Sequence, residues 1–224
     1  MLDQDGRPLR LTWSYTRAEI IADGVIHAIG VSLGIAGAVV LVLLTIHAAG
    51  GVQTASALIY AIGLVALLGF SAAYNMWPVS RWKWLLRRCD HSAIYLLIAA
   101  TYTPFLVQMK TDAISIGLLA GIWATALAGI ALKLFLPGRF DRFSVCLYLI
   151  LGWSGVLAYD SLIEPLSALT LALLAVGGAL YSIGVIFHTR RGLRFQNAVW
   201  HSFVLAAALC HYFAVLETVA FAQN

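Results

Sequence analysis

The stretch Gly24–Ala49, GVIHAIGVSLGIAGAVVLVLLTIHAA, decides the fold of this chain. It contains no Asp, Glu, Lys or Arg, and it exceeds the roughly 20 mostly apolar residues that an α-helix needs to cross a bilayer. In lipid the backbone N–H and C=O groups must pair within their own segment, and an α-helix achieves this. The stretch therefore predicts a transmembrane helix.

The composition extends this prediction to the whole chain. Of the 224 residues, 62% are hydrophobic and 11% are charged, and the mean hydropathy is +0.89. A soluble domain is closer to half apolar and a quarter charged. The net charge of +4 would suggest nucleic acid as a partner of a soluble protein. Here the basic residues lie in short connections between apolar runs, so membrane topology explains them and no nucleic-acid partner is expected.

Six further apolar runs are long enough to span a membrane: about 55–77, 91–108, 113–136, 143–162, 166–187 and 196–221. A membrane β-barrel would instead show alternating segments of about ten residues. We therefore expect an all-α bundle of seven transmembrane helices in the inner (plasma) membrane. Residues 1–23 would form a cytoplasmic N-terminal segment, and residues 24–222 would form the transmembrane domain.

The distribution of basic residues predicts the orientation of the bundle. Thirteen of the 14 Lys and Arg residues fall on one side of the seven runs, and Lys110 alone falls on the other. Connections rich in Lys and Arg stay in the cytoplasm. The N-terminus is therefore expected inside and the C-terminus outside. The basic-aromatic stretch 81–84, RWKW, is interpreted as an interfacial anchor ahead of a third helix that Asp90 and His91 open.

Polar residues of four predicted helices fall at one depth, near the cytoplasmic face. Ionisable groups within membrane helices are costly and are candidates for function by default. Asp90 alone would be interpreted as a helix cap, and the histidines as interfacial residues. Their common depth instead suggests one polar pocket. Its candidate members are Glu19, Asp23, His27, Ser71, Asn75, Asp90, Asn197 and His201.

Several of these residues lie in stretches that resemble the hemolysin III family. The stretches are Glu19–His27 (EIIADGVIH), Ser71–Asn75 (SAAYN), Asp90–Pro104 (DHSAIYLLIAATYTP) and Asn197–His201 (NAVWH). This family is the bacterial branch of the progestin and adipoQ receptor family. The resemblance covers nearly the whole chain and implies seven helices with the N-terminus inside.

The resemblance also implies a cytoplasmic-side zinc site that hydrolyses a lipid amide. Three histidines would bind the metal and an aspartate would hold a metal-bound water. Ser71 and Asp90 match the family pattern and are the candidate catalytic residues. The metal positions, however, fall on Asn75, Asn197 and His201, so only one ligand survives. Neutral amide oxygens are poor zinc ligands.

We therefore expect a degenerate metal site with no bound cofactor, although zinc stays open if other residues rebuild the ligand set. The expected function is non-catalytic binding of a membrane lipid, another ligand or a partner. The alternatives are a zinc-dependent lipid hydrolase with a rebuilt site and a channel or pore-forming protein. No helix centre carries the ring of charges that would favour a channel.

Overall fold

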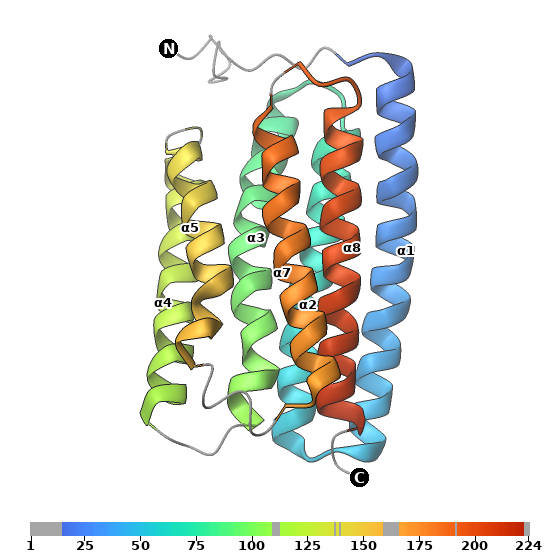
Figure 1. Cartoon of the computed structure of the whole chain (residues 1–224). Helices are drawn as coiled ribbons and strands as arrows, with labels where there is room; N and C mark the ends of the chain where they lie inside the picture. Colours follow the sequence, from blue (N-terminus) through green and yellow to red (C-terminus); the bar gives the residue numbers. More distant parts are fainter. Residues whose placement is uncertain are drawn as a thin grey trace.

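A computed structural model describes residues 15–108, 113–136, 138, 140–158, 166–190 and 192–221. Within these residues the chain forms seven α-helices and no strand (Figure 1). The helices are α1 (Arg17–Ala48), α2 (Gly51–Met76), α3 (Arg81–Gln108), α4 (Ala113–Phe135), α5 (Asp141–Trp153), α7 (Ala168–Thr189) and α8 (Gln196–Leu216). A 3₁₀ turn, η1 (Ser154–Ala158), extends α5, and a π turn, η2 (Glu217–Phe221), extends α8.

The described helices confirm an all-α membrane bundle. Five of them, α1, α2, α4, α7 and α8, are long and apolar enough to cross a membrane. Helix α3 begins with a polar, basic segment, and the described part of α5 is short. The predicted fifth helix beyond Ala158 lies outside the described residues, as do residues 1–14 and the basic residues Lys110, Arg139 and Arg191.

The prediction that Asp90 and His91 open the third helix is wrong. Helix α3 begins at Arg81, so both residues lie in its interior and Asp90 is not a cap. The stretch 81–84 lies inside α3 rather than ahead of it, and its role as an interfacial anchor stays a prediction. Lys83 is only 7% exposed, and its ammonium group donates to the backbone carbonyl oxygens of Asn75 and Trp77. Because this charge finds partners inside the bundle, the helix continues through the basic segment.

Helix α1 also begins earlier than predicted, at Arg17 rather than near Gly24. Thr16 and Glu19 form a capping box, in which each side chain accepts a hydrogen bond from the other residue's backbone N–H. Such a box satisfies N–H groups that the first turn of a helix leaves unpaired. The capping box therefore adds nearly two turns to the helix and carries Asp23 into its interior.

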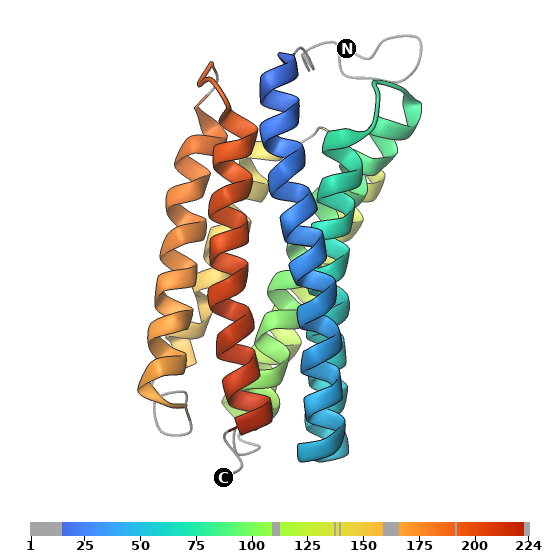
Figure 2. The same ribbon diagram turned by 90° about the vertical axis from the view of Figure 1, so that its right-hand side faces the viewer.

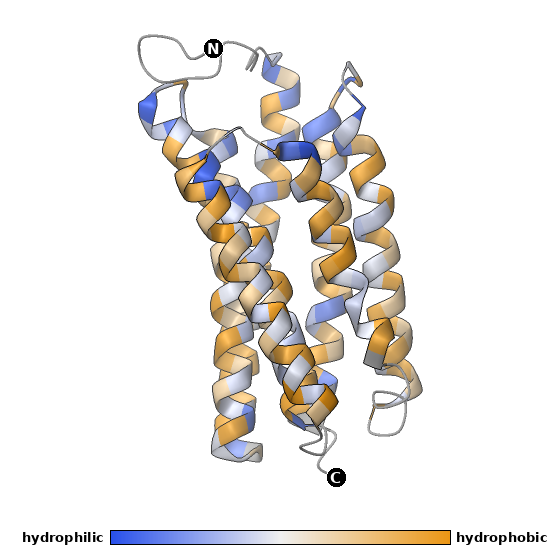
Figure 3. Ribbon diagram, turned by 90° about the vertical axis from the view of Figure 1, so that its left-hand side faces the viewer, coloured by the Kyte–Doolittle hydropathy of each residue, from blue (hydrophilic) through white to orange (hydrophobic). Residues whose placement is uncertain are grey.

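The helices pack in an order that surrounds a central space. Helices α1 to α4 pack each on the next, α7 packs on α8, and α8 returns to α1. Figure 2 shows α1 between α8 and α2. Fully buried aromatic residues, including Tyr60 and Tyr95, lie in the core, whereas many large apolar side chains face outward. Hydrophilic residues gather at the end of the bundle where α1 begins (Figure 3). This polar end positions the candidate site.

Candidate functional site

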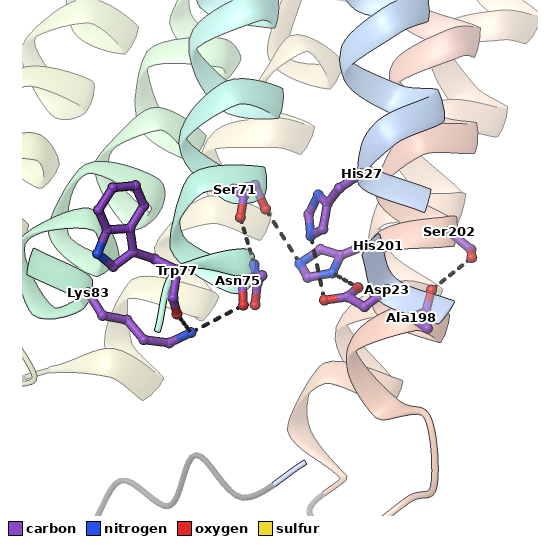
Figure 4. A network of polar contacts seen from close by, with 9 residues as sticks. All are labelled: Asp23, His27, Ser71, Asn75, Trp77, Lys83, Ala198, His201 and Ser202. Carbon is purple, nitrogen blue, oxygen red and sulfur yellow. Dashed lines mark hydrogen bonds and ion pairs between the residues drawn. The ribbon is translucent and has the colours of Figure 1, made fainter. Parts of the chain in front are cut away.

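The polar end of the bundle holds a buried cluster of one carboxylate and two histidines. Asp23 and His27 lie one turn apart on α1, and His201 lies on α8 (Figure 4). Asp23 is 3% exposed and His27 is 6% exposed. His201 Nδ1 lies 2.6 Å from Asp23 Oδ1, and His27 Nε2 lies 3.6 Å from Asp23 Oδ2. The Asp23 carboxylate therefore bridges two imidazole rings whose centroids are 4.4 Å apart.

The contact between His201 and Asp23 assigns the tautomer of His201. A carboxylate can only accept hydrogen bonds, so Nδ1 of His201 carries the proton in this contact. In a neutral imidazole the other nitrogen, Nε2, then holds a lone pair that can accept a proton. That nitrogen lies 3.5 Å from the Ser71 hydroxyl oxygen on α2. Residues from three helices thus line up as serine, histidine and aspartate.

The remaining predicted pocket residues lie around this line. Asn75 donates from its amide nitrogen to the backbone oxygen of Ser71 at 2.9 Å, and Asn197 lies in the first turn of α8. Asp90 lies 3.2 Å from His91 Nδ1. Glu19 caps α1 and also accepts from the backbone N–H of Phe195 at 3.1 Å, which ties the start of α1 to the start of α8.

A cavity of about 1310 Å³ connects this polar cluster to the apolar interior. Its polar end includes Ser71, Asn75, Asp90, Asn197 and His201, together with Glu19 and His27. Its other walls are largely apolar and come from α3, α5, α7 and α8, reaching as far as His211. Asp23 lies behind His201, outside the cavity lining, where it can orient the imidazole. The cavity thus has one charged end and a long apolar remainder.

Sequence reasoning missed a second charged cluster, which also lines the cavity. Asp141, at the start of α5, accepts from Arg87 Nη2 at 2.9 Å and from Lys133 Nζ at 2.8 Å. Both cations are buried, at 7% and 2% exposure. The spacing of Lys83, Arg87 and His91 at every fourth residue was the available signal, because such residues share one face of a helix. This cluster joins α3, α4 and α5 around the cavity.

The metal positions implied by the family resemblance do not fit a zinc site. Asn75 uses its amide nitrogen on its own helix, and amide oxygens are weak zinc donors. Asp23, His27 and His201 do form a group whose potential ligand atoms lie within 4.8 Å of one another. However, ligand atoms about 2.0 Å from one tetrahedral zinc ion are separated by about 3.3 Å. The 2.6 Å contact between Asp23 Oδ1 and His201 Nδ1 is therefore a hydrogen bond, and a metal ion at this group would have to use other atoms of the two side chains.

This fold and site define a polytopic α-helical membrane protein with an acid–histidine cluster at one end of an internal cavity. Comparisons with known proteins specify the class further. The family profile described as "Haemolysin-III related" matches residues 17–212. The chain belongs to the hemolysin III family and is a multi-pass protein of the plasma membrane.

Individual relatives agree with this assignment. The chain is 37% identical to "Hemolysin-3 homolog" of Bacillus subtilis, over 90% of this chain and 95% of the relative. It is 40% identical to "Hemolysin-3" of Bacillus cereus, over 88% and 90%. It is also 31% identical to the human "Monocyte to macrophage differentiation factor", over 71% and 68%. No solved structure matches the chain.

Proposed function

We propose that this protein binds a single-chain membrane lipid in its internal cavity, without a metal ion. The polar headgroup would lie against Ser71, Asn75 and Asn197, and the acyl chain would run along the apolar walls toward His211. The observation that carries this proposal is the shape and chemistry of the cavity, which has one polar end and a volume of about 1310 Å³. Small-molecule sites are typically about 300–1,000 Å³. The larger volume here suits a long amphiphile.

The orientation that the family resemblance implies favours the cytoplasmic leaflet as the source of this lipid. If the N-terminus is cytoplasmic, the polar end of the cavity lies near the cytoplasmic leaflet. A lipid whose headgroup reaches the polar cluster from that leaflet keeps its chain at membrane depth. This geometry avoids burying the headgroup in hydrocarbon, which is costly for a polar group without partners.

A photoactivatable monoacylglycerol with a diazirine in its acyl chain tests the proposal. Irradiation of the purified protein in nanodiscs should crosslink the probe to cavity residues of α5 and α7, and excess unlabelled monoacylglycerol should compete. Ala175→Trp places an indole in the cavity wall of α7 and should reduce crosslinking several-fold. The matched control is Val176→Trp, because Val176 is 52% exposed and outside the cavity lining. Equal crosslinking in the two variants would refute the cavity as the binding site.

The second candidate is a zinc-dependent lipid hydrolase with a rebuilt ligand set. One observation favours it: among the residues that the structure describes, the buried His27 Nε2 finds no hydrogen-bond partner, and it lies beside Asp23 and His201. These residues offer three donors, and catalytic zinc sites have three protein ligands and an open position. Elemental analysis of the purified protein separates the candidates. Zinc near one per chain, lost in His27→Gln, would favour the hydrolase.

A further inference from the structure

We propose that Ser71, His201 and Asp23 form a metal-free catalytic triad that hydrolyses the ester bond of a long-chain acyl lipid. This inference rests on the proposed function, because the substrate must first enter the cavity. It goes beyond lipid binding by assigning a reaction to the polar end. Ser71 is the nucleophile, His201 is the general base, and Asp23 is the residue that positions the base.

The order of contacts across the three helices matches the requirements of such a triad. A serine triad needs a hydroxyl beside one imidazole nitrogen and a buried carboxylate on the other nitrogen. Here Ser71 Oγ lies 3.5 Å from His201 Nε2, and Asp23 Oδ1 lies 2.6 Å from His201 Nδ1. The first distance is long for a hydrogen bond. Contacts between nucleophile and base are often loose without substrate and shorten when it binds.

The triad is buried from water at the carboxylate of Asp23 and faces the cavity at Ser71 and His201. Asp23 is 3% exposed and lies outside the cavity lining, so water is largely excluded from the carboxylate that orients the base. Ser71 and His201 line the cavity, where an acyl group can reach them. A buried carboxylate and an accessible serine are the arrangement that lets the imidazole take up a proton next to the substrate.

Two asparagines supply donors near the reacting carbonyl group. Asn75 and Asn197 line the same cavity as Ser71, at the positions where the family resemblance implies metal ligands. Their side-chain amides carry N–H groups, and one N–H of Asn75 already donates to the Ser71 backbone oxygen. Amide donors directed at a developing oxyanion lower the barrier to acyl transfer. The same substitutions that remove metal ligands therefore introduce groups that suit a serine mechanism.

The reaction proceeds in two balanced steps. In the first, Ser71 Oγ attacks the ester carbonyl carbon and its proton moves to His201 Nε2. The bond to the alcohol oxygen breaks, and the alcohol leaves with that proton, giving an acyl ester on Ser71. In the second, a water molecule attacks this ester and gives its proton to His201. The fatty acid leaves, and the proton returns to Ser71 Oγ. The net reaction consumes one ester and one water and yields one acid and one alcohol.

A long-chain alkyl fluorophosphonate, which labels activated serines covalently, tests the triad. The full chain is purified in nanodiscs with EDTA present, treated with the probe and analysed by intact mass and peptide mapping. One label per chain on Ser71 is expected. Ser71→Ala should abolish labelling. Asp23→Asn should slow it roughly 10²–10⁴-fold, because the imidazole loses the carboxylate that fixes its tautomer. Thermal stability of each variant verifies that it is folded.

A matched serine provides the control. Ser202 follows His201 on α8 but lies outside the cavity lining, and its hydroxyl donates to the backbone oxygen of Ala198 at 2.7 Å. Ser202→Ala should therefore label at the unmutated rate. Labelling that persists in Ser71→Ala, or that is unchanged in Asp23→Asn, would overturn the triad.

The monoacylglycerol crosslinking assay distinguishes the two proposals. Crosslinking within the cavity of a protein that does not react with the fluorophosphonate would overturn the triad and leave lipid binding intact. Loss of both signals in folded protein would overturn both.

Discussion

Close packing between α3 and α4 should make Gly129 intolerant of even a methyl group. A Cβ added at Gly129 would lie 2.4–2.6 Å from three ring atoms of Tyr95. The Tyr95 ring cannot move away easily, because the residue is fully buried and packs on the ring of Tyr148 at 4.4 Å between centroids. Tyr148 in turn donates to the backbone oxygen of His91 beside the cavity. A displacement of the Tyr95 ring at the helix contact would therefore also shift Tyr148, which contacts the candidate site.

Two opposing terms set the size of this effect. Overpacking a dense core costs about 1–3 kcal/mol, and the upper end applies where the contacted ring is held on all sides. Replacing a helical glycine with alanine returns about 0.8–1.0 kcal/mol of helix propensity. Gly129→Ala should therefore destabilise the protein by about 2 kcal/mol. For a chain of this length that corresponds to a Tm roughly 4–8 °C lower.

Gly121 supplies the matched control on the same helix. A Cβ at Gly121 meets nothing within 4 Å, so Gly121→Ala should leave the Tm unchanged or raise it slightly. Thermal unfolding in one detergent, followed by intrinsic tryptophan fluorescence, compares the two variants directly. A Tm for Gly129→Ala equal to that of Gly121→Ala would refute the steric argument. Tyr95→Leu in the Gly129→Ala background should cost less than the two single changes added together, because the clashing ring is gone.

Three further predictions concern orientation, metal binding and the second charged cluster. Reporter fusions after Ser80 and after Arg194 should be cytoplasmic and a C-terminal fusion external; a cytoplasmic C-terminus would contradict seven spans. The purified protein should hold no stoichiometric zinc, and the double change Asn75→His with Asn197→His should create zinc binding measurable by elemental analysis; zinc in the unmutated protein would be the contrary result. Asp141→Ala should lower the stability of the protein by about 3 kcal/mol. This value is near the lower end for breaking a buried ion pair, because the Asp141 side chain is 40% exposed. An unchanged Tm would show that the two buried cations do not need the Asp141 carboxylate.

The lipid environment made the main features of the fold readable from sequence. A run such as 24–49 has no stable arrangement in lipid other than a helix, because its backbone groups must pair internally. The helical runs were therefore predicted, and the end of α2 and the bounds of α4 agree within a residue. The start of α3 was not, since charged residues normally indicate the end of a membrane span. Lys83 and Arg87 reverse that rule because partners on other segments satisfy them.

The candidate site, too, could be predicted from the sequence only in part. The sequence by itself predicted which polar residues share one depth, since a helix rises by a fixed 1.5 Å per residue. The resemblance to the hemolysin III family also implied that Asn75 and Asn197 depart from the family's zinc ligands. The depth of a residue does not say which way its helix is rotated about its own axis, or which helices are its neighbours. Only the packing of α1 against both α2 and α8 brings His201 onto Asp23 on one side and within 3.5 Å of Ser71 on the other. The alignment of Ser71, His201 and Asp23 is a property of three helix faces meeting, and no single segment encodes it.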